Sequence, residues 1–258
     1  TDGAGEPLYT VPGLTSLAVG DFNNDGFRDL VATGWSNDTI MLMTGHPDHV
    51  FNEPVFFPLK GAPRSVCCAH LDDDKNLDLI VSLYATSEIA LLQGNGKGEF
   101  TEKARFNSRG KLPVSVLYKD INGDGSGDII VAHADAGDNI SIFYGGRPYQ
   151  FSISQDIPLG KAQNVLEYGI KDGVAADFND DGAADLALAC QALPGVVVLI
   201  NESGNTTMPQ KFRQEEYLFK EGEPLALATA DLDGNGYLDL AVSLGSSNSV
   251  SFLKNNKK

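Results

Sequence analysis

Short apolar runs alternate with acidic and glycine-containing loops along the chain, and the same order of segments returns about every fifty residues. In the first repeat, residues 17–22, 30–33, 40–44 and 51–59 are rich in apolar side chains, and Gly, Asn and Asp separate them. Short runs of this kind between turn-forming residues predict β-strands. Pro54 suits an edge strand, since proline donates no hydrogen bond to a sheet. The pattern therefore predicts four short antiparallel strands per repeat.

The repeats extend over the whole chain. An acidic loop between the first and second predicted strands begins at residues 21, 70, 120, 177 and 231. A fixed period near fifty residues indicates a repeat architecture, and four short strands per repeat are typical of a propeller blade. We therefore expect one all-β domain over residues 1–258, a five-bladed β-propeller of four-stranded antiparallel blades. The predicted blades are approximately residues 13–60, 61–110, 111–160, 161–221 and 222–258, the last together with 5–12.

The two ends of the chain are expected to meet in one blade. The fifth repeat has only three predicted strands, and residues 6–12 resemble residues 53–59, the fourth strand of the first repeat. If residues 6–12 complete the last blade, the ring closes and no strand edge is left unpaired, which removes a risk of aggregation.

The acidic loops have the composition of calcium sites. In residues 120–128, Asp-Ile-Asn-Gly-Asp-Gly-Ser-Gly-Asp, acidic or amide side chains take the first, third, fifth and ninth positions and glycine the sixth. Ca²⁺ prefers six to eight oxygen ligands, and glycine permits the sharp turn that directs them inward. The alternative is a turn capped by its own Asp and Asn side chains without metal. Three carboxylates within nine residues would then repel one another, so we favour calcium.

Net charge excludes some partners. Asp and Glu number 35 against 19 Lys and Arg, a formal charge of −16. This argues against general affinity for nucleic acid or an anionic membrane. We find neither an apolar stretch long enough to span a membrane nor an N-terminal signal sequence, and we interpret the chain as the mature form if it is exported.

The loop pattern resembles a known family. Asp-x-Asn/Asp-x-Asp/Asn-Gly-x-x-Asp-Leu/Ile between short strands, with Val114-Ser-Val-Leu-Tyr before it in the third repeat and Gly94-Asn-Gly-Lys-Gly-Glu-Phe in the second, resembles the FG-GAP and VCBS repeats. These repeats form integrin α-subunit propellers and occur in secreted bacterial and fungal proteins. The resemblance implies a calcium-binding propeller in an extracellular or cell-surface location, periplasmic if bacterial. It does not choose among adhesion receptors, lectins and lyase-associated propellers.

The resemblance also implies a ligand set of four to five Ca²⁺ sites on one rim of the ring. The second loop departs from the pattern through His70 and Lys75 and is expected to be the weakest site or an empty one, because imidazole is a poor ligand for a hard cation. By position, the side-chain ligands and the seventh-position backbone carbonyls would be Asp21, Asn23, Asp25, Phe27 and Asp29; Asp72, Asp74, Asn76 and Asp78; Asp120, Asn122, Asp124, Ser126 and Asp128; Asp177, Asn179, Asp181, Ala183 and Asp185; and Asp231, Asp233, Asn235, Tyr237 and Asp239.

The other rim is the candidate ligand surface. Strand parity places there the turns between second and third strands and the connections between blades. Trp35, Tyr84, His133 and Tyr168 are its candidate ligand-binding residues. An indole in a polar turn could stack on a sugar ring, but Trp35 and Tyr84 could equally pack between blades.

Three functions remain open. The first is a non-enzymatic binding module for a glycan or a partner protein. The second is a lyase or hydrolase, which needs a convergent acid/base pair such as His133 with Tyr168 or Lys171. The third is a structural subunit that docks through the insertion at residues 163–172 and the loop at residues 201–210. We favour the first, since no recognisable catalytic signature is present.

Overall fold

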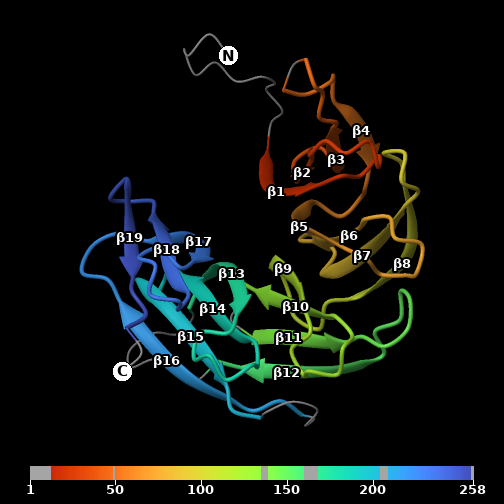
Figure 1. The fold of residues 1–258 in the computed structure, drawn as a ribbon. Coiled ribbons are helices and arrows are strands. Elements are labelled where there is room, and N and C mark those ends of the chain that lie inside the picture. Colours follow the sequence, from red (N-terminus) through yellow and green to blue (C-terminus); the bar gives the residue numbers. More distant parts are fainter. Residues whose placement is uncertain (1–12, 49, 135–138, 160–167, 204–208, 257–258) are drawn as a thin grey trace.

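Five antiparallel sheets follow one another around a ring in the computed structural model (Figure 1). The structure describes residues 13–48, 50–134, 139–159, 168–203 and 209–256. Four sheets have four strands, and the fifth has three within the described residues. The strands are, in blade 1, β1 (Leu14–Gly20), β2 (Asp29–Gly34), β3 (Thr39–Met43) and β4 (Val55–Pro58); in blade 2, β5 (Pro63–Ala69), β6 (Asp78–Leu83), β7 (Glu88–Gly94) and β8 (Phe100–Asn107); in blade 3, β9 (Pro113–Lys119), β10 (Asp128–His133), β11 (Asn139–Tyr144) and β12 (Ile153–Pro158); in blade 4, β13 (Ile170–Ala176), β14 (Asp185–Cys190), β15 (Gly195–Asn201) and β16 (Phe212–Leu218); and in blade 5, β17 (Pro224–Ala230), β18 (Asp239–Leu244) and β19 (Ser249–Leu253).

The predicted all-β, five-bladed propeller is confirmed. The first strands of successive blades, β1, β5, β9, β13 and β17, contact one another in that order around the inside of the ring. Each first strand pairs with the second strand through a register shift near its start, as between Leu14 and Ser16. The part of the chain that the structure describes has no helix long and apolar enough to cross a membrane.

The hydrophobic core is divided among the interfaces between blades. Four clusters of buried side chains lie between blades 1 and 2, 2 and 3, 3 and 4, and 4 and 5. In the first of these, Ile40 and Leu42 of β3 pack with Val66, Leu79 and Val81 of blade 2. Third-strand residues therefore alternate between the preceding and the following blade, as the two-residue period of a strand requires.

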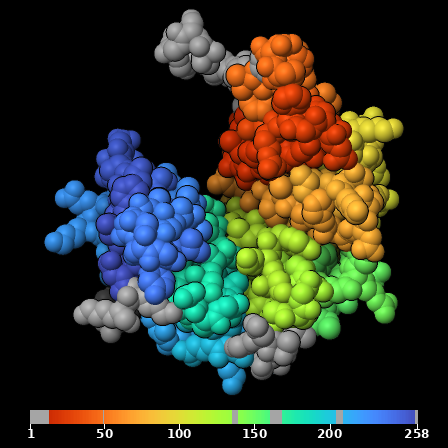
Figure 2. Space-filling view, in the orientation of Figure 1, coloured from red at the N-terminus to blue at the C-terminus, as the bar shows by residue number. Residues whose placement is uncertain are grey.

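Blades 1 and 5 present apolar faces that no neighbouring blade covers in the described residues. Val250 and Phe252 of β19 are each 58% exposed, whereas Ile89 and Leu91, at the same register positions of β7, are 0% exposed. The space-filling view shows the opening between the two blades (Figure 2). The predicted fourth strand of blade 5, residues 6–12, lies outside the described residues.

Candidate functional site

One aspartate in each blade ties the corner loop to the rest of its sheet. Asp29, the ninth residue of the first loop, is fully buried. Its Oδ2 accepts the backbone N–H of Phe22 at 2.7 Å, and its Oδ1 accepts that of Gly45 at 2.8 Å. The same two bonds recur for Asp78 with Leu71 and Gly94, Asp128 with Ile121 and Gly145, Asp185 with Phe178 and Asn201, and Asp239 with Leu232 and Asn255.

Burial makes the ninth-position carboxylates of blades 1 to 4 costly to ionise. The pKa of Asp128 is raised to about 6, chiefly by desolvation and also by the nearby carboxylates of Asp124 and Asp120. The hydrogen bonds from the two backbone N–H groups lower this pKa but do not outweigh the burial. Desolvation likewise raises the pKa of Asp29 and Asp185. In blade 5 the N–H groups of Asn255 and Leu232 lower the pKa of Asp239. Like charges crowd these corners, and a cation bound among them would stabilise the ionised form.

The remaining loop residues form a shared pattern of hydrogen bonds. In the first loop, Asp21 accepts the N–H groups of the fifth and sixth residues, Asp25 and Gly26, at 3.1 and 2.9 Å. Asn23 Nδ2 donates to Asp25 Oδ2 at 2.7 Å, and the N–H of Phe27 donates to Asp25 Oδ1 at 2.8 Å. The third and fourth loops repeat these bonds. The side-chain oxygens of the predicted ligands are therefore gathered at one corner per blade.

Glycine at the sixth position has a backbone reason. Gly26, Gly125, Gly182 and Gly236 have φ of 89°, 89°, 87° and 90°, in the region that L side chains rarely adopt. A Cβ at any of them would meet no atom within 4 Å. The turn, and not crowding, therefore selects glycine.

The fifth loop brings three carboxylates closest together. Oxygens of Asp231, Asp233 and Asp239 all lie within 4.8 Å of one another. Asp239 is buried and the other two are exposed, so this cluster opens to solvent on one side. Lys254 Nζ lies 3.4 Å from Asp233 Oδ2. An all-oxygen donor set of this kind fits the hard cations Ca²⁺ and Mg²⁺.

The second loop is built differently. His70 takes the first position, and its Nδ1 lies 2.8 Å from the backbone oxygen of Asn76. Lys75 replaces the glycine and still adopts a φ of 66°. Burial opposes ionisation of Asp72, but hydrogen bonds, including those from Tyr149 and Gln93, outweigh it and lower its pKa. The donor set of this loop does not fit calcium as the other four do.

Of the four candidate ligand residues, two are accessible. Trp35 is 46% exposed, and its ring meets that of Tyr84 edge-on at 6.5 Å between blades 1 and 2. Packing between blades and partial exposure therefore coexist in this pair. His133 is 0% exposed at the end of β10, and Tyr168 is 4% exposed with its hydroxyl donating to Glu216 Oε1 at 2.9 Å. Both side chains are buried, so neither presents an open surface to a ligand among the described residues.

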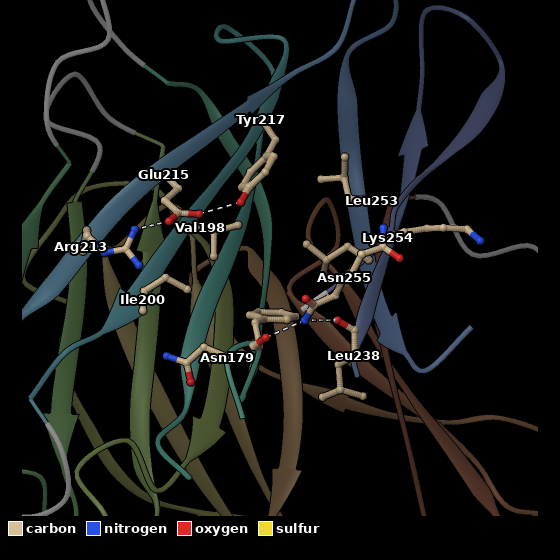
Figure 3. A pocket seen from close by; sticks show the side chains of 13 residues that line it. Asn179, Val198, Ile200, Arg213, Glu215, Tyr217, Leu238, Leu253, Lys254 and Asn255 are labelled. Atoms are coloured by element: carbon tan, nitrogen blue, oxygen red, sulfur yellow. Dashed lines mark hydrogen bonds and ion pairs between the residues drawn. The ribbon is translucent and has the colours of Figure 1, made fainter. Parts of the chain in front are cut away.

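A groove that the sequence analysis did not indicate lies between blades 4 and 5 (Figure 3). It encloses about 450 Å³ between β16 and β19. Arg213, Glu215 and Tyr217 lie along one side, where Tyr217 donates to Glu215 at 2.6 Å and Arg213 pairs with Glu215. Leu253 and Lys254 lie on the other side.

The other interfaces explain this groove. Between blades 1 and 2, Phe100, the first residue of β8, packs edge-on against Phe22 at 5.7 Å and Phe57 at 5.6 Å. Phe178 and Tyr217 take the positions of Phe22 and Phe57 in the groove. The groove is thus the place that a fourth strand of blade 5, headed by a large side chain, would fill. Phe51, Phe100, Phe151 and Phe212 follow the third strands of repeats 1 to 4, and this recurring aromatic position is the sequence signal for the contact.

Comparison with known proteins agrees with the fold and the loops. The FG-GAP-like repeat matches residues 21–81, 70–131, 120–188 and 177–242. Integrin alpha-PS3 of Drosophila melanogaster is 28% identical over 145 residues, 50% of this chain and 13% of the integrin. The chain therefore spans a small part of the length of that relative.

Solved structures show the same fold at low identity. The structure of BBS1N in complex with ARL6DN superposes with a TM-score of 0.58 at 12% identity, over 95% of this chain and 70% of that one. A protein from Lactobacillus plantarum gives a TM-score of 0.59 at 13% identity, over 93% of this chain and 70% of that one. With four matched repeats spanning most of its length, the chain belongs to the FG-GAP-like repeat family.

Proposed function

We propose that this chain is a calcium-stabilised, extracellular or cell-surface binding module that recognises a partner protein and catalyses no reaction. The observation that carries the calcium part is the recurring corner, in which a buried ninth-position aspartate faces further Asp and Asn oxygens. Loops 1, 3, 4 and 5 would hold one ion each. Bound Ca²⁺ supplies positive charge that offsets carboxylate repulsion and joins the first and second strands of the blade.

The family supports the binding role. A propeller of FG-GAP-like repeats with similarity to an integrin α chain fits a binding module. BBS1N, which has this fold, was crystallised in complex with another protein. A protein ligand is therefore our first candidate, and a glycan is the alternative that the exposed face of Trp35 favours.

Two of the three groups named for the catalytic alternative are buried, and the third, Lys171, is partly exposed. A lyase or hydrolase would need an acid and a base that reach the substrate. His133 and Tyr168 are both buried within the fold, and Tyr168 is bound to Glu216. The integrin-like relative also favours a non-catalytic domain.

The Trp35–Tyr84 pair is the proposed contact surface, and its role can be tested directly. The immobilised chain would be probed with a panel of purified extracellular proteins and with a glycan array, in calcium and in EDTA. Trp35→Ala should weaken binding of the identified ligand at least tenfold. Phe56→Ala is the matched control, because Phe56 lies in the same blade and is also 46% exposed.

The outcomes separate the candidate functions. Binding of one protein class that depends on Trp35 supports the proposal, and binding of one sugar class supports the glycan alternative. Equal loss of binding in both variants, or turnover of a polyuronide substrate, would overturn it.

A further inference from the structure

We propose that the second corner, residues 70–78, is calcium-independent, and that hydrogen-bond donors from blades 2 and 3 take the place of a cation there. The inference rests on the calcium part of the proposed function. It predicts that the five-bladed chain binds four calcium ions and not five.

His70 takes the first position of the second loop. In the other four loops the first residue is an aspartate that accepts N–H groups of the fifth and sixth residues. An imidazole in that place removes two ligand oxygens. A carbonyl oxygen can only accept, so His70 Nδ1 carries the proton that bonds Asn76 O at 2.8 Å. His70 thus occupies the seventh-position carbonyl that a cation would otherwise use.

The second loop has carboxylates at its third and fifth positions, Asp72 and Asp74. In loops 1, 3 and 4 the third residue is an asparagine that donates to the fifth-position aspartate. Loop 2 has Asp72 in that place and lacks this donor. Gln93 of β7 supplies it, with Nε2 at 2.8 Å from Asp72 Oδ2 and 3.3 Å from Asp74 Oδ2. A neutral amide therefore bridges the two carboxylates.

Blade 3 supplies a further hydrogen-bond donor to the second loop. The hydroxyl of Tyr149, in the connection between β11 and β12, donates to Asp72 Oδ2 at 3.1 Å. Tyr149 has a φ of 56°, an uncommon conformation for an aromatic residue. In this conformation the Tyr149 hydroxyl reaches Asp72, and the hydrogen bond joins blade 3 to the corner of blade 2.

Lys75 takes the sixth position of the second loop. The residue holds the left-handed turn without glycine, and its exposed ammonium is carried by the same loop as four Asp carboxylates. A fixed positive charge in the loop opposes a divalent cation and offsets part of the negative charge. Loop 2 therefore holds its shape and balances part of its charge with its own residues.

Calcium stoichiometry tests the inference. The whole chain would be freed of metal, titrated with CaCl₂ by calorimetry, and its bound calcium measured after gel filtration. Four ions per chain are expected. Asp124→Asn and Asp74→Asn are a matched pair, since both change the fifth position of a loop. The first should lower the count to three, and the second should leave it at four.

A designed variant gives the converse test. His70→Asp, Lys75→Gly, Gln93→Thr and Tyr149→Phe together restore the loop pattern. Threonine is chosen at position 93 because Thr44 precedes Gly45 at the equivalent place in blade 1. This variant should bind five ions. Five ions on the unaltered chain, or a count that falls with Asp74→Asn, would overturn the inference. No bound calcium at all would instead overturn the proposed function.

Thermal unfolding supplies a second measurement that does not require a gain of binding. Tyr149→Phe should lower the melting temperature by the same amount in calcium and in EDTA, whereas Asp124→Asn should lower it more in calcium. A Tyr149→Phe effect that vanished in EDTA would tie Tyr149 to a bound ion and contradict the inference.

Discussion

The side-chain amide of Asn201 donates to the backbone oxygen of Ile121 at 3.0 Å, across the interface between blades 4 and 3. The same amide lies 3.3 Å from the oxygen of Ala184 in its own corner loop. Asn255 makes the corresponding bonds to Phe178 at 2.6 Å and Leu238 at 3.3 Å. Blades 1 to 3 have glycine in this place, and a Cβ at Gly94 would lie 2.2 Å from the oxygen of Leu77. In blades 4 and 5, asparagine therefore stands where the other blades have glycine packed closely against the corner loop, and its amide hydrogen-bonds the preceding blade to its own corner loop.

Asn201→Ala should destabilise the fold by about 1–3 kcal/mol, because it leaves two buried backbone oxygens without this donor. Asn201→Asp should cost more, since it keeps the shape but cannot donate. Urea unfolding in saturating calcium measures both. Asn201→Gly, which copies blades 1 to 3, is the control for backbone effects. Equal stability of the asparagine and aspartate forms would show that the bridge contributes nothing.

Removal of calcium should lower the melting temperature by several degrees, since an ion that binds only the folded chain stabilises it. Asp231→Asn removes one carboxylate from the cluster with Asp233 and Asp239. The variant should melt earlier than the unaltered chain in calcium and close to it in EDTA. Differential scanning calorimetry in both buffers makes the comparison. A variant that lost as much stability in EDTA as in calcium would place the role of Asp231 in its bonds to the loop backbone.

The repeat pattern predicted most of the fold. Residues 30–33 and 40–44 correspond to β2 and β3, because buried strands are short apolar runs between turn residues. The fourth strand was less well predicted: residues 51–59 were expected, whereas β4 is Val55–Pro58 and Phe51 makes only a bridge with Gly45. Outer strands bury little surface, so their hydrophobic pattern is weak.

The site was predicted by residue type better than by role. Asp29 and its equivalents were expected as calcium ligands, and the structure adds that each accepts two backbone N–H groups, one of them from a residue 16 or 17 positions later. The donor in this bond is a backbone N–H, which glycine and asparagine both have. The residue type in the sequence therefore does not reveal the bond. His133 was placed on a rim turn but is the last residue of β10 and is buried. Whether His133 lies in the strand or in the turn depends on where β10 ends, and the hydrophobic pattern of the sequence predicts strand ends only to within a few residues.

Stability should depend on pH through Asp172, which joins three blades. Its Oδ2 accepts the N–H of Leu227 at 3.0 Å, and its Oδ1 accepts the Ser115 hydroxyl at 3.3 Å. Desolvation raises its pKa above the ordinary 3.8, outweighing these bonds. A raised folded pKa means that this contribution to stability is complete below about pH 3.8 and is lost as the pH rises through the folded pKa.

Asp172→Asn keeps the shape without the charge, so its melting temperature should rise relative to that of the unaltered chain as the pH increases above about 3.8. Asp156→Asn is the control of opposite sign. Hydrogen bonding to Arg109 lowers the pKa of Asp156, so its contribution is present above about pH 3.8 and lost as the pH falls through the folded pKa. Asp156→Asn should therefore melt at a lower temperature than the unaltered chain at neutral pH. Parallel pH profiles for the two variants would refute the assignment.

The outer edge of β19 pairs with no other strand among the described residues. Each other third strand pairs with a fourth, as β7 does with β8 from Glu88 to Gly94. Residues 6–12 are predicted to be that fourth strand for blade 5. A chain without residues 1–12 should therefore melt several degrees lower and associate with itself. An unpaired strand edge offers backbone N–H and C=O groups to another chain, and exposed Val250 and Phe252 add an apolar surface. Calorimetry and sedimentation velocity measure the two effects. Replacing residues 1–5 alone with Gly and Ser is the control, and unchanged melting and mass after the full deletion would show that another segment, or none, pairs with β19.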